Sequence, residues 1–152
     1  MSYKQTVIAA ALVVGAGLSL QAQHRPAAKA KPTAKAAAAP ALQASLTRGA
    51  VVYKNVCLTC HQADGYGVPN LNPPLIKTTY VLGDKAKLAH IVLAGLQEPV
   101  EINGDEYRQH MPAQNYLTDQ QVADVLTYVR NSFGNKASAV QVAEVKAVRA
   151  TL

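Results

Sequence analysis

The sequence predicts a mainly α-helical domain. Three segments place apolar residues at the three- and four-residue spacing of an amphipathic helix. Each of these segments is preceded by a polar residue suited to cap a first helical turn, namely Ser45, Asp84 or Thr118. A fourth segment, near the C-terminus, repeats the apolar spacing over a shorter length.

The N-terminal residues 1–22 have the layout of a secretory signal peptide. Lys4 is followed by an uncharged apolar run and then by Gln21-Ala22-Gln23, which suits cleavage after Ala22. The alternative is an uncleaved anchor, because residues 5–23 are all uncharged and about long enough to cross a bilayer.

Residues 23–44 are rich in alanine, lysine and proline and lack aromatic residues, so we expect a linker that forms no packed core. Residues 1–45 carry five basic side chains and no acidic one, in a chain whose net charge is +6. The basic charge therefore belongs mainly to the tail. It suits contact with anionic lipid, cell wall or an acidic protein, or it merely keeps the tail soluble, and we expect no nucleic-acid partner.

Residues 45–135 form the predicted domain. Ser45 is expected to cap a helix that runs to Cys57, and Asp84 a helix that ends near Gly95. Thr118 and Gln121 have the spacing of a capping box that opens a further helix. Residues 136–152 are predicted to be a C-terminal extension containing a short helix, with apolar residues at Val142, Val145 and Val148.

The segment Cys57-Leu58-Thr59-Cys60-His61 has the pattern for covalent attachment of a c-type haem. Residues i and i+3 project to the same side of a helix, so both sulfur atoms can reach the two vinyl groups while His61 ligates the iron. Two other interpretations of the cysteines are a thioredoxin-like dithiol and a zinc site. The zinc site would have to be completed by His24, His90, His110 or a carboxylate after His61.

Met111 is the expected second axial ligand. Haem iron in electron carriers is typically held by His and Met, and the chain contains only Met1 and Met111. Met1 precedes the export segment, whereas Met111 stands directly before Pro112. The metal ligands predicted are therefore His61 and Met111.

The stretch from Leu46 to Asn131 resembles the class I c-type cytochromes, bacterial monohaem proteins among them. In that family a glycine and an aromatic residue on the first helix cross the last helix at close range. Gly49, Tyr53 and Tyr128 stand at matching positions. The resemblance implies three to five helices around one covalent haem c.

The resemblance also implies that a backbone carbonyl of a Pro-x-Leu segment orients the haem histidine. Pro73-Pro74-Leu75 stands where that segment is expected, so Pro73 takes the carbonyl role and Leu75 is expected to face the porphyrin. We therefore expect the haem to be bound by Cys57, Cys60, His61, Met111, Pro73 and Leu75.

The region before Met111 departs from the mitochondrial pattern. Alternating residues around Asn103-Gly104 predict a small β-hairpin, as in a subset of bacterial cytochromes. The chain has no tryptophan to bond a haem propionate, which leaves Tyr80 and Arg108 as candidates, with ordinary surface positions as the alternative. His90 is expected to be a surface or core histidine, and His110 to point away from the iron.

With both axial positions filled, the haem has no open site for substrate, so we expect an electron-transfer protein and not an enzyme. The resulting hypothesis is an exported protein, periplasmic or on the outer face of the cytoplasmic membrane, with oxidoreductase, oxidase or reductase partners and an N-terminal membrane tether if the anchor persists. The alternatives are a haem subunit of a dehydrogenase or reductase complex, a haem peroxidase and a gas sensor.

Overall fold

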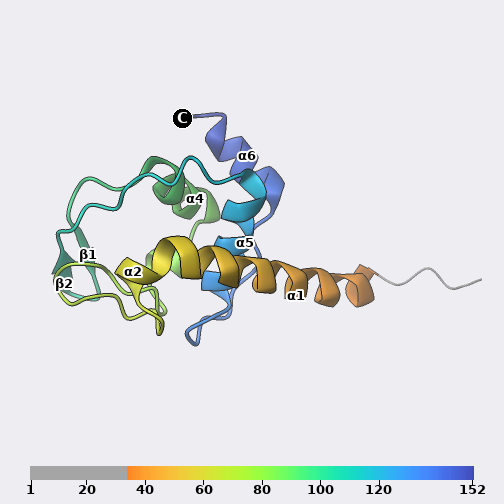
Figure 1. Ribbon diagram of the computed structural model, residues 1–152, viewed down its shortest axis with the longest axis horizontal. Helices are drawn as coiled ribbons and strands as arrows, with labels where there is room; N and C mark the ends of the chain where they lie inside the picture. The colour runs from red at the N-terminus through yellow and green to blue at the C-terminus, as the bar shows by residue number, and fades with distance from the viewer. Residues whose placement is uncertain (1–33) are drawn as a thin grey trace, which may run out of the picture. The chain divides into compact units, whose positions relative to one another are not determined.

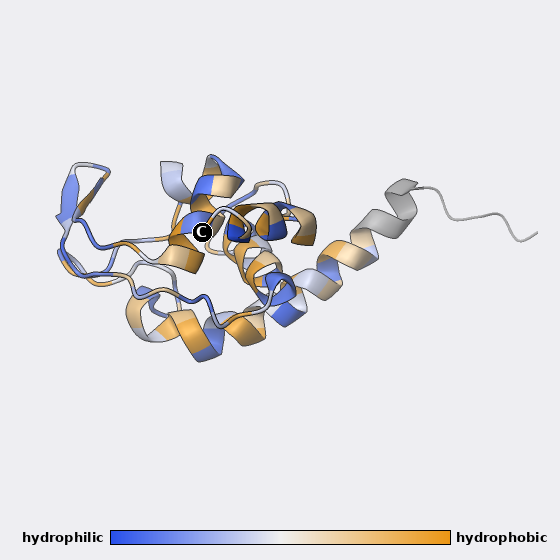
Figure 2. Ribbon diagram, turned by 90° about the horizontal axis from the view of Figure 1, so that it is seen from above, coloured by the Kyte–Doolittle hydropathy of each residue, from blue (hydrophilic) through white to orange (hydrophobic). Residues whose placement is uncertain are grey.

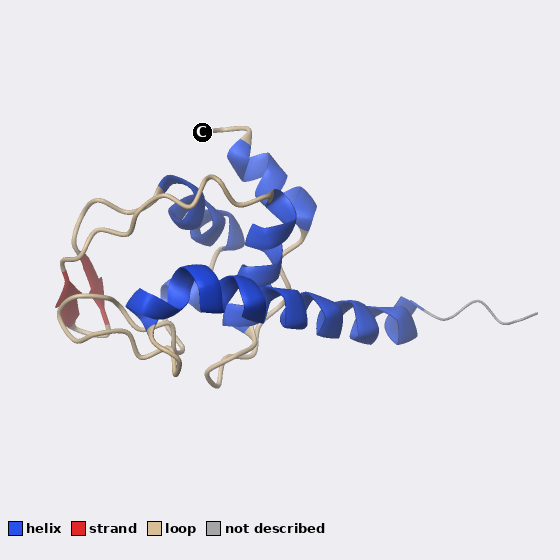
Figure 3. Ribbon diagram, in the orientation of Figure 1, coloured by secondary structure: helices blue, strands red, loops and turns tan. Residues whose placement is uncertain are grey.

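The computed structural model describes residues 34–152, so the predicted signal peptide and the first part of the predicted linker lie outside the described residues. Among the helices described over residues 34–152, none combines the length and hydropathy needed to cross a bilayer. The chain folds into helices with a two-stranded hairpin at one edge (Figure 1 and Figure 3). The buried hydrophobic side chains of the helices form one core cluster. In order, the elements are α1 (Ala34–Val52), the π-helical turn η1 (Tyr53–Cys57), α2 (Leu58–His61), α3 (Thr79–Leu82), α4 (Lys85–Ala94), β1 (Val100–Ile102), β2 (Asp105–Tyr107), α5 (Asp119–Arg130) and α6 (Val142–Arg149).

The mainly α-helical class and the predicted helix starts at Asp84 and Thr118 are confirmed. The Asp84 carboxylate accepts hydrogen bonds from the backbone N–H groups of Ala86 and Lys87 and so caps α4, which ends at Gly95. Thr118 and Gln121 form the capping box that opens α5. The element α3 was not predicted, because its single turn is too short to show a periodic pattern.

The prediction that Ser45 caps the first helix is wrong. The helix α1 already begins at Ala34, inside the segment expected to be a linker, and Pro40 lies within it. Alanine has the highest helix propensity, so this alanine-rich stretch extends an anchored helix backward at little cost. Residues 39–41 are exposed, and α1 runs past the rest of the domain in Figure 1.

Ser45 has a different partner, because its hydroxyl donates to the Asp124 carboxylate on α5 at 2.6 Å. The guanidinium of Arg48 donates twice to the same carboxylate, at 2.6 and 2.9 Å. The pKa of Asp124 lies below its usual value: burial alone would raise it, but the hydrogen bonds from Arg48 and Ser45 outweigh burial. The buried charge of Asp124 therefore links α1 to α5.

The two helices cross at Gly49, as the family resemblance implied. A methyl group added there would collide with the Asp124 backbone carbonyl and come within 2.7 Å of Tyr128 Cβ. Next to the crossing, the Tyr53 ring lies 5.4 Å from the Tyr128 ring and 5.3 Å from the Phe133 ring, centroid to centroid. Glycine is needed here because it has no Cβ, and the aromatic rings fill the space beside it.

The predicted β-hairpin is present. Strands β1 and β2 are antiparallel, with Val100 opposite Tyr107 and Ile102 opposite Asp105. Asn103 and Gly104 connect them with positive φ angles of 56° and 91°, the backbone that an Asn-Gly turn provides. The hairpin is largely hydrophilic in Figure 2, whereas the helices carry most of the hydrophobic residues.

The C-terminal extension packs on the domain where the sequence predicts a short helix. Val145 of α6 is fully buried, and Val140, just before α6, exchanges hydrogen bonds with the Thr127 hydroxyl of α5. Arg130, buried at the end of α5, donates to the backbone carbonyls of Val81 and Ser138. These contacts tie the extension to α5, and Arg130 also joins α5 to α3.

We predict that Gly49→Ala lowers the free energy of unfolding by about 1–3 kcal/mol, the usual cost of overpacking. In an unconstrained helix the same change stabilises by up to about 1 kcal/mol, so the sign of the effect is diagnostic. Denaturant titration followed by circular dichroism measures it. Val51→Ala, on an exposed part of the same helix, is the control and should change stability little.

We also predict that Asp124 makes part of the stability depend on pH. A carboxyl group whose pKa is lowered by folding stabilises the fold at pH values above its unfolded pKa of about 3.9, and that contribution is lost as pH falls through the lower folded pKa. Asp124→Asn should therefore destabilise the protein at neutral pH and flatten the acid limb of its stability curve. Unfolding titrations between pH 2 and 7 test this, with the exposed Asp105→Asn as the control; an unchanged acid limb would contradict the assignment.

Candidate functional site

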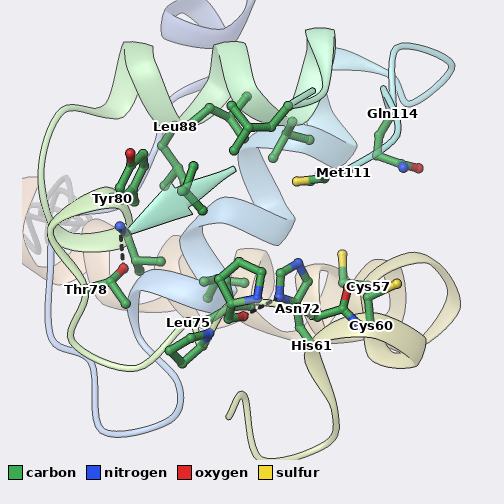
Figure 4. A pocket seen from close by; sticks show the side chains of 18 of the residues that line it. Cys57, Cys60, His61, Asn72, Leu75, Thr78, Tyr80, Leu88, Met111 and Gln114 are labelled. Atoms are coloured by element: carbon green, nitrogen blue, oxygen red, sulfur yellow. Dashed lines mark hydrogen bonds between the residues drawn. The ribbon is translucent and has the colours of Figure 1, made fainter. Parts of the chain in front are cut away.

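The cysteine motif lies where the first helix widens into a π-helical turn and then ends. The turn η1 has π-helical geometry, which often occurs at functional sites, and it passes directly into α2 with His61 as the last residue. Cys57 and Cys60 are unpaired and half-buried. Figure 4 shows their sulfur atoms beside the His61 ring at one wall of a pocket.

The pocket walls are mainly apolar. The space between these walls, open mouth included, amounts to about 1210 Å³. Side chains from α4, α5, the hairpin and the loops before α3 and α5 line it, among them Leu75, Leu88, Val92, Leu96, Val100, Ile102, Leu117, Val125, Leu126 and Val129. Such walls exclude water and lower the local dielectric, which suits a flat apolar group.

The His61 ring is held by the backbone of the following loop. Its Nδ1 lies 3.0 Å from the Pro73 carbonyl oxygen, and because a carbonyl only accepts, Nδ1 carries the proton. The Nε2 lone pair therefore remains for a metal. Gly67 closes the loop by donating its N–H to the His61 carbonyl at 3.1 Å, and Asn135 donates to the Leu75 carbonyl at 2.8 Å.

Burial shifts the pKa values of His61 and Cys57, the titratable groups at this wall of the pocket. It lowers the pKa of His61, and the hydrogen bond to Pro73 offsets only part of that effect, so the imidazole stays neutral. Burial, assisted by the neighbouring Cys60, raises the pKa of Cys57 to about 11. Redox-active CxxC thiols have a lowered pKa, about 7 in thioredoxin, so the environment of Cys57 differs from that of a catalytic dithiol.

Met111 reaches the pocket from the side opposite His61 (Figure 4). Its backbone pairs with Leu96 through two reciprocal hydrogen bonds of 2.9 Å, so the main chain at Met111 is fixed. Gly95 has a φ of +80°, and a side chain there would come within 2.6 Å of the Met111 carbonyl. Gly95 therefore permits the close approach of α4 to the segment that carries Met111.

These residues fit a covalently attached haem. Two unpaired thiols stand at the pocket edge, a neutral imidazole and a thioether face the cavity from opposite walls, and the remaining walls are apolar. Histidine and methionine are an established axial pair for haem iron. Over residues 34–152, no three His, Cys, Asp or Glu side chains gather in an arrangement that could hold a metal ion by themselves.

Of the other residues considered from the sequence, some line the pocket and others lie outside it. Tyr80 lines the pocket, whereas Arg108 pairs with Glu106 at 2.7 Å and is not among the pocket residues. His90 is exposed on α4, and His110 is exposed but is among the residues that line the pocket. The polar lining residues Asn72, Thr78, Gln109 and Gln114 were not predicted, because nothing in the local sequence distinguishes them from surface residues.

Comparison with known proteins supports the same interpretation. A family model described as cytochrome c matches residues 46–133. The cytochrome c subunit of a quinone-dependent alcohol dehydrogenase from Gluconobacter oxydans is 36% identical over 107 residues, which are 68% of this chain and 22% of that subunit. The gluconate 2-dehydrogenase cytochrome c subunit of Pantoea cypripedii is 39% identical over 63% of this chain and 22% of the relative.

A shorter relative, cytochrome c-552 of Thermus thermophilus, is 32% identical over 91 residues, which are 57% of this chain and 69% of the relative. The chain thus spans about a fifth of the two dehydrogenase subunits and 69% of cytochrome c-552.

We predict that Gly67→Ala disturbs the hydrogen bond between His61 and Pro73. Gly67 has a φ of +70°, and a methyl group there would come within 2.7 Å of the Pro73 carbonyl oxygen. The strain should cost about 1–3 kcal/mol of stability. A weaker hydrogen bond makes His61 a poorer donor to ferric iron, so the reduction potential should rise. Gly104→Ala, which also has a positive φ but open space around it, controls for backbone strain and should leave the potential unchanged.

Proposed function

Because the chain belongs to the cytochrome c family, we propose that it is an exported monohaem protein that carries single electrons from a respiratory or dehydrogenase donor to a terminal acceptor. The haem is of the c type, attached through Cys57 and Cys60 next to His61. Membership of this family favours haem attachment over a dithiol or a zinc site, the two other interpretations of the cysteines. When bound, haem supplies a one-electron iron couple.

The observation that carries the proposal is the placement of two ligands on opposite walls of one apolar pocket. His61 presents a neutral imidazole whose Nδ1–H donates a hydrogen bond to the Pro73 carbonyl. Met111 presents a thioether from the opposite wall, and its backbone is hydrogen-bonded to that of Leu96. If His61 and Met111 both held the iron, no position would remain on it for oxygen or substrate. A methionine ligand and apolar walls favour the reduced state, so we expect a comparatively high potential.

Export is inferred from the cofactor and the N-terminus together. Haem c is attached outside the cytoplasmic membrane, and residues 1–22 have the composition of a signal peptide. The product would then be periplasmic, or tethered to the outer face of the membrane if the segment is retained. The basic residues after position 22 would be attracted to an anionic surface at short range.

A second candidate is a haem subunit within a dehydrogenase complex. It is favoured by the relatives, of which several are cytochrome subunits of alcohol, gluconate or fructose dehydrogenases. The free carrier is favoured by the similarity to cytochrome c-552, whose name mentions no dehydrogenase. Both candidates use the same haem domain and differ in whether the partner is permanent. Co-purification of a dehydrogenase with the native protein from its own membranes separates them.

A peroxidase or a gas sensor would require Met111 to leave the iron. We predict that the reduced wild-type protein is nearly inert to carbon monoxide and that the oxidised protein shows the weak sulfur-to-iron charge-transfer band. Met111→Ala should abolish the band, lower the potential and open the iron to carbon monoxide. Absorption spectroscopy and potentiometric titration measure these changes.

The control is His90→Ala, because His90 is exposed and not among the pocket residues. It should leave the band and the potential unchanged, and both variants should keep one haem per chain through acid-acetone extraction. Rapid carbon monoxide binding or peroxide turnover by the wild-type protein would contradict the carrier function.

A further inference from the structure

The segment between Met111 and α5 has no regular secondary structure, although it follows the expected iron ligand directly. Its first part is held by α4. Besides the paired hydrogen bonds between Met111 and Leu96, the Gln114 N–H donates to the Val92 carbonyl at 2.8 Å. A coil without a hydrogen-bond ladder of its own depends on such external contacts for its position.

The other end of this segment is held by the C-terminal extension. The guanidinium of Arg149, in the last turn of α6, donates from Nη1 to the Asn115 carbonyl at 2.9 Å and from Nη2 to the Leu117 carbonyl at 2.6 Å. Its Nε donates to the Asp119 carboxylate at 2.6 Å. One side chain therefore bonds two carbonyls of the Met111 segment and the first residue of α5, beside which α6 lies in Figure 1.

This set of acceptors requires arginine. A planar guanidinium directs several donors at once in a fixed fork, whereas a lysine ammonium is a single point of charge on a flexible stem. The side chains of Arg149 and Asp119 are only 32% and 26% exposed, so the bonds to Asp119 and to the Leu117 carbonyl are partly shielded from water. Hydrogen bonds donated by a charged guanidinium are stronger than those between two neutral groups.

The helix α6 is itself anchored, which makes it a suitable support. Val145 is fully buried against the core. The Lys85 ammonium on α4 lies 2.7 Å from the Glu144 carboxylate, and Val140 is bonded to Thr127 of α5. The position of Arg149 is thus set by α4 and α5, the helices that supply much of the pocket wall.

We propose that the C-terminal extension, through Arg149, positions the Met111 segment and so sets how firmly Met111 stays on the iron. Arg149 acts as a positioning residue, because it does not line the pocket. The proposal rests on the proposed function, in which Met111 is the distal ligand. Without Arg149, the segment would keep its bonds to α4 and the buried Leu117 side chain but lose the hydrogen bonds to its Asn115 and Leu117 carbonyls. Local opening would then release the thioether more often while the helices remain folded.

The test compares Arg149→Gln with Lys146→Gln in the full-length holoprotein. Both changes remove one positive charge from α6, but Lys146 is exposed and is not among the residues bonded to the Met111 segment. For Arg149→Gln, carbon monoxide should bind the reduced protein about tenfold faster, which corresponds to about 1.4 kcal/mol of easier local opening. The sulfur-to-iron band should also disappear at a lower denaturant concentration than the helical circular dichroism. Lys146→Gln should match the wild type.

Arg149→Lys distinguishes positioning from charge. It retains a cation beside Asp119 but cannot bond all three acceptors, so it should recover stability more than inertness to carbon monoxide. It also serves if Arg149→Gln fails to fold. The proposal is overturned if Arg149→Gln or Arg149→Lys loses stability while the sulfur-to-iron band and the carbon monoxide rate stay at wild-type values. It is also overturned if Arg149→Lys restores both the stability and the inertness to carbon monoxide. A wild-type protein that lacks the band would instead overturn the assignment of Met111 on which the proposal rests.

Discussion

The close crossing of α1 and α5 at Gly49 is the contact on which the rest of the structure depends. The motif Cys57 to His61 is continuous with α1 through η1 and α2, so the angle and depth of this crossing decide where the thiols and the imidazole stand relative to the pocket. The walls opposite come largely from α4 and α5. A residue larger than glycine would separate α1 from α5 and move the attachment site as a unit.

The two expected ligands are positioned by backbone groups and not by polar side chains. His61 is held by the Pro73 carbonyl and Met111 by the main chain of Leu96. Neither ligand therefore needs a polar side chain to orient it in a pocket whose walls are mainly apolar. Two glycines with positive φ, Gly67 and Gly95, allow the loops to approach closely enough for these bonds.

Charged groups lie around the pocket, where they join elements that are distant in sequence. Asp124 links α1 to α5, Arg130 links α5 to the segments around Val81 and Ser138, and Arg149 links α6 to the Met111 segment. Each is satisfied by several hydrogen bonds, which offsets the cost of removing a charge from water. The C-terminal extension is in this way part of the haem domain's framework.

Local sequence by itself determined the cofactor motif, the caps at Asp84 and Thr118 and the Asn-Gly hairpin, because each depends on residues a few positions apart. The crossing at Gly49 joins residues that are distant in sequence, and it was the family resemblance that indicated it. Local sequence misplaced the start of the first helix: Ser45 has the chemistry of a cap, but its hydroxyl bonds Asp124, 79 residues away. Only the tertiary structure decided the hydrogen bond between Ser45 and Asp124, the backbone pairing of Met111 with Leu96 and the hydrogen bonds from Arg149 to the Met111 segment. Those contacts join backbone carbonyls and side chains across the fold, and a carbonyl group leaves no signal in the amino-acid sequence.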